Sequence, residues 1–202
     1  MPLKNVSRET LAKLEIYLAL LGKWQKAVNL VGPNTMADAW HRHFMDSAQI
    51  ANYIPQDAQT LLDFGSGAGF PGLVLAMLRP DLDVNLVESD EKKCQFLRNV
   101  SRETSTPVTI HNTRIEYLKA SGQEIMPDII TARALGDLKM LLDFALPYAQ
   151  KNPELVLLLP KGEKAPEEIT AAKAIFSFDL QAHKSITNNR AQILEIRQLK
   201  RL

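Results

Sequence analysis

One stretch of the sequence decides the fold: Leu61-Leu62-Asp63-Phe64-Gly65-Ser66-Gly67-Ala68-Gly69-Phe70-Pro71-Gly72. A short apolar run ends in an acid and is followed by four glycines and then by a helix-like segment. Strand, glycine turn and helix in this order form the first β-turn-α unit of a doubly wound sheet. Glycine lets the backbone turn tightly and lie against a ligand where a Cβ would collide. The stretch therefore predicts a ligand-binding loop. Pro71 is expected at the first helical position, and the free N–H groups of that helix start are expected to receive a polar ligand group.

Two acids indicate which ligand the loop binds. Gly67, Gly69 and Gly72 match the G-x-G-x-x-G pattern of dinucleotide sites, which is a weak signal alone. Asp63 ends the strand, where a carboxylate would repel a pyrophosphate and attract a cation. S-adenosylmethionine carries an ammonium and a sulfonium but no phosphate, so Asp63 favours it over NAD. Glu88 ends the next apolar run and is expected to bind ribose hydroxyls, which either cofactor offers. An NAD-type dehydrogenase or another nucleotide-binding module remains the alternative.

The segments around the loop resemble one protein family. They are Asp63 to Gly72 followed by Arg79-Pro80, Arg42-His43-Phe44-Met45-Asp46-Ser47, Lys23-Trp24-Gln25-Lys26-Ala27-Val28-Asn29-Leu30, and Lys92-Lys93-Cys94-Gln95-Phe96-Leu97-Arg98. Together they are similar to the bacterial small-subunit (16S) ribosomal RNA guanine-N7 methyltransferases, the RsmG or GidB family. The resemblance extends from about Leu14 to Lys161, most of the chain. The glycine loop alone would indicate only a methyltransferase.

The resemblance implies a class I S-adenosylmethionine-dependent methyltransferase (Rossmann-like) fold and methylation of guanine N7 in 16S rRNA. The residues expected to bind the cofactor are Asp63, Gly65, Gly67, Gly69, Phe70, Glu88, Ile115, Glu116 and Arg133. Among them, the resemblance assigns adenine contacts to Ile115 and Glu116; the alternative is that Glu116 caps a short helix and Ile115 is core. The candidates for RNA contact are Asn29, Ser47, Arg114 and Lys161, with Lys161 on a backbone phosphate.

The end of the fourth expected strand, at Arg133, is where the reaction is expected. The chain lacks the Asn/Asp-Pro-Pro-aromatic turn of amino-directed methyltransferases. Methylation at pyrimidine C5 needs a cysteine nucleophile at this or the next strand end. The single cysteine, Cys94, follows the second strand and is expected to be a packed core thiol. Guanine N7 fits what remains, because it has a lone pair and no proton to remove. Arg133 is the expected catalytic residue, whose planar fork would hydrogen-bond guanine or a phosphate; a surface salt bridge is the alternative.

Composition indicates a soluble globular protein, with 46% hydrophobic and 23% charged residues. No apolar run approaches the ~20 residues of a membrane span, and the N-terminus lacks the apolar region of a signal peptide. We therefore expect a cytoplasmic protein, a monomer without a membrane partner. The net charge of +1 is low for an RNA binder, so any RNA-binding face must be formed by folding.

The pattern of apolar residues predicts two parts: an N-terminal helical cap, residues 1–56, packed on a methyltransferase domain, residues 57–202. Helices are expected over residues 7–28, 41–53, 71–79, 91–104, 136–149 and 164–174. Strands are expected over 60–64, 84–88, 107–111, 128–132, 154–159, 175–180 and 191–197. The alternation predicts a mostly parallel sheet covered on both faces. The last two strands are too close in sequence for a crossover helix, so they are expected to form a C-terminal antiparallel hairpin.

A metal site is not expected in the segment that holds His41, His43 and Asp46. His43 and Asp46 are three residues apart and share a helix face, but no further ligand has recognisable spacing. Helix packing and hydrogen bonding are the expected roles of this pair. Trp24 and Trp40 are expected in the core rather than stacked on RNA bases.

Overall fold

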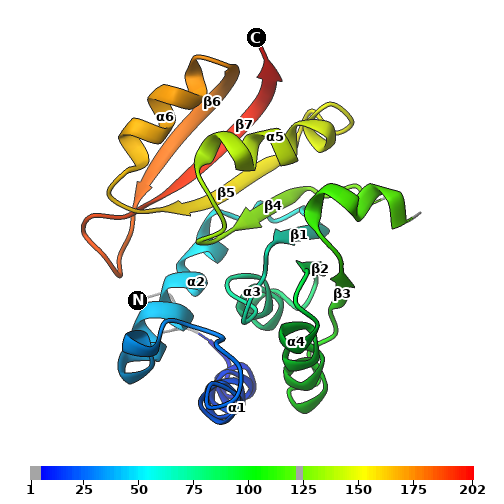
Figure 1. The fold of residues 1–202 in the computed structure, drawn as a ribbon, viewed down its shortest axis with the longest axis vertical. Helices are drawn as coiled ribbons and strands as arrows, with labels where there is room; N and C mark the ends of the chain where they lie inside the picture. The colour runs from blue at the N-terminus through cyan, green and yellow to red at the C-terminus, as the bar shows by residue number, and fades with distance from the viewer. Residues whose placement is uncertain (1–5, 122–124) are drawn as a thin grey trace.

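The computed structural model describes residues 6–121 and 125–202, whose strands form a seven-stranded sheet in the order β3-β2-β1-β4-β5-β7-β6 (Figure 1). The strands are β1 (Thr60–Phe64), β2 (Asp83–Glu88), β3 (Thr109–Asn112), β4 (Ile129–Ala132), β5 (Val156–Lys161), β6 (Phe176–Lys184) and β7 (Gln192–Arg201). The first five strands pair in parallel. β7 pairs antiparallel with both β5 and β6. The predicted fold class and the C-terminal hairpin are therefore confirmed.

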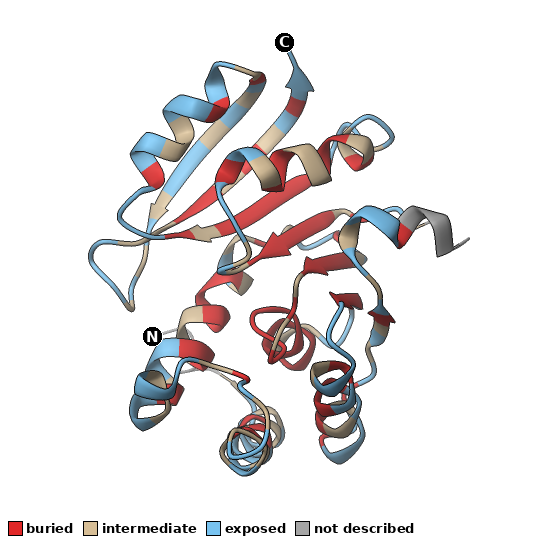
Figure 2. Cartoon of the chain, viewed as in Figure 1, coloured by how far each residue is buried: buried red, intermediate tan, exposed pale blue. Residues whose placement is uncertain are grey.

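Helices cover both faces of this sheet. They are α1 (Arg8–Trp24), α2 (Asp46–Ala48), α3 (Gly72–Leu78), α4 (Glu91–Glu103), α5 (Leu138–Ala149) and α6 (Ala165–Lys173). In Figure 1, α1, α3 and α4 lie below the sheet, whereas α5 and α6 lie above it. Side chains of a strand alternate between the two faces. Leu61 accordingly belongs to the hydrophobic cluster of the first face, and the next residue, Leu62, to that of the second. The central strands are buried along nearly their whole length, as Figure 2 shows.

The N-terminal part packs directly on the sheet domain. Ser7 caps α1, since its side chain accepts a hydrogen bond from the N–H of Thr10 at 3.0 Å. Tyr17 is fully buried, and its ring stacks on Phe70 of the glycine loop at 5.2 Å between centroids. Trp24 and Trp40 pack, partly buried, against the same cluster, as predicted. The N-terminal helices and the sheet domain thus share one hydrophobic core.

The helix predicted over residues 41–53 is present, but it is irregular. After a 3₁₀ helix, η1 (Pro33–Asp38), the chain forms a π-helical turn, η2 (Trp40–Met45), then α2 and another 3₁₀ turn, η3 (Gln49–Tyr53). The carbonyl oxygen of Arg42 in this segment accepts a hydrogen bond from Arg133, 91 residues away. Single π-helical turns occur frequently at functional sites.

The described part of the chain contains no helix that is both long enough and apolar enough to cross a membrane.

Candidate functional site

The glycine loop after β1 adopts a backbone that favours glycine. Gly65, Gly67 and Gly69 have φ angles of 61°, 57° and 91°, a region that L-residues with side chains rarely occupy. The N–H of Ser66 donates to the carbonyl oxygen of Val87 at 2.9 Å, which fixes the loop to the end of β2. The hydroxyl of Tyr17 donates to the carbonyl oxygen of Ala68. The loop is therefore held from both the sheet and α1.

Asp63 caps the helix that follows the loop. α3 begins at Gly72, one residue later than predicted, with Pro71 outside it. The N–H of Gly72 donates to Asp63 Oδ2 at 3.2 Å, and Thr131 Oγ1 donates to Asp63 Oδ1 at 2.8 Å. The N–H of Leu73 donates to the carbonyl oxygen of Gly69. The prediction that this helix start offers free N–H groups is therefore wrong for Gly72 and Leu73. Their partners are Asp63 at the end of β1 and the loop carbonyl oxygen of Gly69.

Burial changes the ionisation of Asp63. Its side chain is fully buried, and desolvation raises the pKa of the carboxyl to about 6 in spite of the hydrogen bonds that favour the charged form. Asp63 also does not line the cavity described next. Gly69 does not line this cavity either. A Cβ at Gly69 would meet Tyr17 Oη at 2.6 Å and Leu73 Cδ1 at 2.7 Å, so this side of Gly69 faces packed side chains rather than open space. Gly69 instead permits close packing of helices against the loop.

A cavity of about 560 Å³, which we call the loop cavity, opens beside the glycine loop. It brings together the other residues expected to bind the cofactor, namely Gly65, Gly67, Phe70, Glu88, Ile115, Glu116 and Arg133. Ile115 and Glu116 belong to the first turn of η4 (Ile115–Ser121), which follows β3. Arg114, exposed, lines the cavity beside them. These residues come from the carboxyl ends of β1 to β4, where doubly wound sheets bind ligands.

Glu88 connects the loop cavity to the backbone around it. One carboxylate oxygen, Oε2, accepts from the N–H of Gly67 at 2.8 Å, and Oε1 accepts from the N–H of Asp90 at 2.8 Å. Cys94 lies behind this residue, with its Sγ 3.3 Å from the carbonyl oxygen of Glu88. Burial raises the pKa of the Cys94 thiol to about 11. Cys94 is fully buried, so the prediction of a packed core thiol is confirmed. Its raised pKa also makes the thiol a poor nucleophile.

Arg133, directly after β4, is held by residues of the N-terminal part. Its Nη1 donates to the carbonyl oxygen of Arg42 at 3.2 Å and lies 3.4 Å from Asp46 Oδ2. Nη2 lies 3.1 Å from Nδ1 of His43, and the guanidinium is 4.9 Å from the centre of the Phe70 ring. The side chain is only 15% exposed, so Arg133 forms a largely buried ion pair rather than the surface salt bridge considered above.

The partners of His43 determine its tautomer. The hydroxyl of Thr35 donates to the carbonyl oxygen of Gly32 at 2.6 Å and therefore accepts from His43 Nε2 at 2.8 Å. Nδ1 is then free of a proton and accepts from Arg133. Burial and the nearby Arg133 lower the pKa of His43 to about 4, which keeps the ring neutral at neutral pH. The predicted hydrogen-bonding role of His43 and Asp46 is confirmed, with Arg133 as their common partner.

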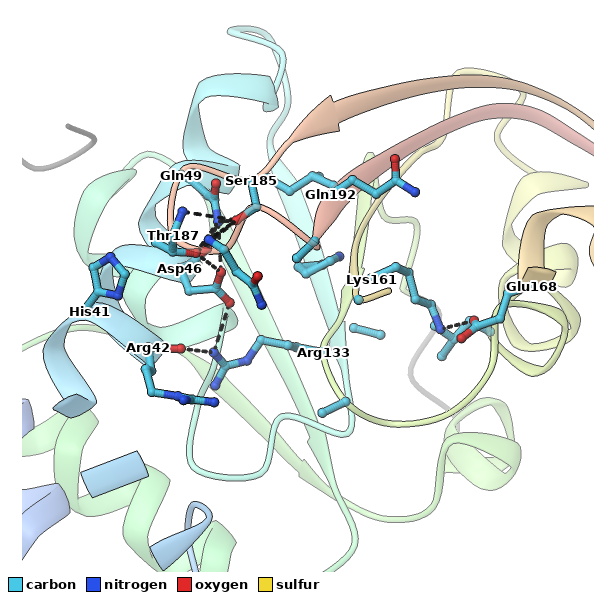
Figure 3. Close-up of a pocket in the computed structure, with 18 of the residues that line it drawn as sticks. His41, Arg42, Asp46, Gln49, Arg133, Lys161, Glu168, Ser185, Thr187 and Gln192 are labelled. Carbon is cyan, nitrogen blue, oxygen red and sulfur yellow. Dashed lines mark hydrogen bonds and ion pairs between the residues drawn. The ribbon is translucent and has the colours of Figure 1, made fainter. Parts of the chain in front are cut away.

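A second cavity, of about 580 Å³, lies between the ends of β4 and β5 and the turn between β6 and β7. We call it the hairpin cavity. Arg133 and Ala134 line both cavities, so the two cavities adjoin at these residues. Figure 3 shows Arg133 pointing toward Asp46 on one side of the hairpin cavity and Lys161 paired with Glu168 on the other. Lys161 Nζ lies 2.8 Å from Glu168 Oε2 and donates to the carbonyl oxygen of Gly136.

The residues considered for RNA contact lie in different environments. Lys161 lines the hairpin cavity, and Arg114 lines the loop cavity. Asn29 is exposed and precedes Leu30, which lines the loop cavity. Ser47 is fully buried, lines neither cavity, and has a hydroxyl without a hydrogen-bond partner among the described residues. The structure therefore does not bring Ser47 to the surface of the site.

Sequence reasoning missed Tyr17, Gln49 and Thr187. Tyr17 reads as one more apolar residue on the buried face of α1, and its hydroxyl contact with the loop has no local signal. Gln49 and Thr187 lie far apart in sequence, and each bonds to the Asp46 carboxylate. Among residues 6–121 and 125–202, no group of three or more His, Cys, Asp or Glu side chains is arranged to hold a metal ion.

Comparison with known proteins identifies a family. The sequence profile of GidB, described as rRNA small subunit methyltransferase G, matches residues 10–199. The chain is 46% identical to the ribosomal RNA small subunit methyltransferase G of Paramagnetospirillum magneticum, covering 98% of this chain and 93% of that protein. The protein of the same description from Rhizobium rhizogenes is 42% identical, over 98% and 96% of the two chains.

Solved structures agree on the fold. The O-methyltransferase TomG from Streptomyces achromogenes, in complex with SAM, superposes with a TM-score of 0.58 at 11% identity, over 92% of this chain and 89% of that chain. Precorrin-6y C5,15-methyltransferase from Geobacter metallireducens superposes with a TM-score of 0.55 at 15% identity, over 75% and 87%. At these identities the likeness concerns the fold alone.

Proposed function

The chain belongs to the rRNA small subunit methyltransferase G family, GidB, and from this premise we propose that it transfers a methyl group from S-adenosylmethionine to N7 of a guanine in 16S ribosomal RNA. The observation that carries the proposal is the pair of cavities that meet at Arg133 and Ala134. A cofactor in the loop cavity and a base in the hairpin cavity would meet beside these two residues, where the methyl group could pass directly from the sulfonium to the base. The family assignment gives no support to the dehydrogenase alternative.

The loop cavity fits the cofactor by shape and by chemistry. A Cβ on Gly67 would have only the carbonyl oxygen of Gly65 within 4 Å, at 3.8 Å, so the space over this glycine is left for a ligand. Glu88, Ile115 and Glu116 line this cavity, where Glu88 would accept from the ribose hydroxyls and Ile115 and Glu116 would contact the adenine. Bound S-adenosylmethionine supplies an electrophilic methyl group on its sulfonium. Asp63 would act on the cofactor indirectly, through the loop geometry that its hydrogen bonds fix.

Arg133 is the proposed catalytic residue, and its donors are only partly used. A guanidinium has five N–H groups. Contacts with Arg42, Asp46 and His43 account for three of them in the described part of the chain. The Nε–H and one Nη2–H group remain available to a ligand. Guanine presents O6 and N7 as neighbouring acceptors, so donation to O6 would orient N7 toward the methyl group. N7 carries no proton, so no general base is required.

The hairpin cavity is the proposed site of the guanine. Lys161, at its far side, is the candidate for a backbone phosphate and would exchange its bond with Glu168 for that contact. Orientation of the two reactants and exclusion of water would be the main contributions of the protein to this reaction. We also propose that the protein acts in the cytoplasm as a monomer and needs no metal. Residues 1–56 would form a helical cap on a methyltransferase domain of residues 57–202.

Methyl transfer from labelled S-adenosylmethionine to small ribosomal subunits, followed by nucleoside analysis, tests the proposal. The expected product is 7-methylguanosine at a single position of 16S rRNA. Titration with S-adenosylhomocysteine and with NAD, followed by tryptophan fluorescence, should detect binding of the first ligand only. Label in any nucleoside other than 7-methylguanosine would contradict the assignment to N7, and binding of NAD alone would restore the dehydrogenase alternative.

A further inference from the structure

The turn between β6 and β7 is fastened to the N-terminal part of the chain. Gln49 Oε1 accepts from the N–H of Ile186 at 2.9 Å, and Gln49 Nε2 donates to Ser185 Oγ at 3.1 Å. Thr187 Oγ1 donates to Asp46 Oδ1 at 2.6 Å. Figure 3 shows these four side chains, Asp46, Gln49, Ser185 and Thr187, gathered at one side of the hairpin cavity.

Polar bonds between segments this far apart in sequence fix the position of the turn. Gln49 is only 2% exposed, and a buried amide without partners would be costly. The turn also supports itself, since Ser185 Oγ accepts from the N–H groups of Thr187 and Asn188 at 3.2 and 3.3 Å. Fully satisfied polar networks of this kind rigidify the groups that they join. These bonds therefore hold the turn in one position. Ile186 at the turn is nevertheless 56% exposed, so hydrophobic burial of this residue is not what holds the turn.

Asp46 connects this turn to Arg133. Its Oδ1 accepts from Thr187 and, at 2.9 Å, from Gln49 Nε2. Its Oδ2 lies 3.4 Å from Nη1 of Arg133. One carboxylate thus bridges the turn that lines the hairpin cavity and the arginine that lines both cavities. A carboxylate fixed on one side by a short hydrogen bond has little freedom to rotate, so its other oxygen is fixed as well.

We propose that Thr187 is a positioning residue for the methyl transfer: through Asp46 it holds the guanidinium of Arg133 in the orientation that receives the guanine. The inference rests on the proposed function and adds the β6–β7 turn to the site. RNA that enters the hairpin cavity meets this turn, so contact with the substrate and alignment of Arg133 are linked. A turn that served only as a staple for the fold would contribute to stability and leave the chemical step unchanged.

The test compares Thr187→Val, which removes the hydroxyl at nearly constant volume, with Thr187→Ser, which keeps it. Single-turnover methylation of small ribosomal subunits should slow about tenfold in Thr187→Val, a loss that corresponds to about 1.4 kcal/mol. Affinity for S-adenosylhomocysteine should stay close to the wild-type value, and Thr187→Val should remain folded at the assay temperature although the lost bond to Asp46 lowers its melting temperature. Thr187→Ser should retain most of the rate, because its hydroxyl still reaches Asp46.

A second readout does not depend on activity. The ¹⁵N resonance of Arg133 Nε should shift or broaden in Thr187→Val and remain unchanged in Thr187→Ser. An unchanged rate and an unchanged Arg133 resonance in Thr187→Val would overturn the inference. A loss of rate matched by an equal fold-loss of affinity for S-adenosylhomocysteine would also overturn it. If the wild-type protein transferred no methyl group, the proposed function would fail, whereas the Arg133 resonance would still decide whether Thr187 positions Arg133.

Discussion

Glu88 Oε2 accepts a hydrogen bond from the backbone N–H of Gly67 at 2.8 Å, and the two residues thereby join the end of β2 to the loop after β1. The same carboxylate lines the loop cavity. Glu88 consequently has two roles in the proposed site. It fixes the position of the glycine loop, and its carboxylate oxygens can accept hydrogen bonds from a ligand. An experiment on this residue has to separate the two.

Glu88→Ala should weaken binding of S-adenosylhomocysteine by roughly 1.5–3 kcal/mol, the range for hydrogen bonds that involve a charged group. If the lost partners are the ribose hydroxyls, an analogue without both hydroxyls should lose much less affinity on the same substitution. Isothermal titration of both ligands against both proteins gives the coupling. An equal loss for the two ligands would show that Glu88 acts through the loop alone.

Gly67→Val should abolish cofactor binding and leave the protein folded. The φ of 57° disfavours any residue with a Cβ by about 1–2 kcal/mol, which a stable domain tolerates. No protein atom other than the carbonyl oxygen of Gly65 lies near the new Cβ, so the side chain would occupy ligand space. Titration with S-adenosylhomocysteine together with circular dichroism checks both parts. Gly22→Ala in α1 is the control and should bind normally; normal binding by a folded Gly67→Val would remove the loop from the site.

The parallel part of the fold is readable from sequence because buried parallel strands are continuous apolar runs that end in functional residues. Leu61–Leu62 before Asp63 and Val84 to Val87 before Glu88 follow this rule. The orientation of Asp63 could not be predicted in this way. Its position at the strand end indicates a ligand contact, but the start of α3 lies close enough to take its carboxylate as a cap.

The hydrogen-bond partners of Arg133 could not be predicted from the sequence for a different reason. Its partners Arg42 and Asp46 precede it by 91 and 87 residues, and Asp46 meets Thr187 141 residues further on. No local pattern records such contacts. Two of these partners, Arg42 and Asp46, lie in the helical segment over residues 41–53, whose apolar spacing predicts a helix but not its π and 3₁₀ turns.

Asp63→Asn should change how stability depends on pH. The folded-state pKa of Asp63, about 6, lies above the ordinary value of 3.8, so the folded state binds the proton more tightly than the unfolded state does. The stabilisation is fully present below about pH 4 and is lost as the pH rises through 6. At about 1.4 kcal/mol per pH unit, the loss is about 3 kcal/mol. Asparagine can keep both hydrogen bonds, accepting from Gly72 and donating to Thr131, but it does not titrate.

Urea unfolding of both proteins between pH 4 and 7 provides the measurement. The free energy of unfolding of the wild type minus that of Asp63→Asn should fall by about 2.5 kcal/mol over this interval, since a small part of the total is already lost at pH 4. His43, whose lowered pKa of about 4 makes stability fall toward acidic pH, is present in both proteins and cancels from the difference. A difference that stays constant with pH would mean that the bonds from Gly72 and Thr131 offset the burial of Asp63 completely.

Arg133→Lys tests the reaction rather than the pocket. Lysine keeps the positive charge beside Asp46 but cannot reproduce the planar fork, which contacts Asp46 and His43 and leaves two N–H groups for a ligand. If those groups orient guanine in the transition state, turnover should fall more than cofactor affinity, about tenfold for each 1.4 kcal/mol lost. Single-turnover methylation of small ribosomal subunits and direct titration with S-adenosylhomocysteine measure the two quantities. Arg98→Lys, on the exposed face of α4, is the control and should change neither. Equal losses in rate and affinity would reassign Arg133 to cofactor binding, and no loss in either would reduce it to the structural partner of Asp46.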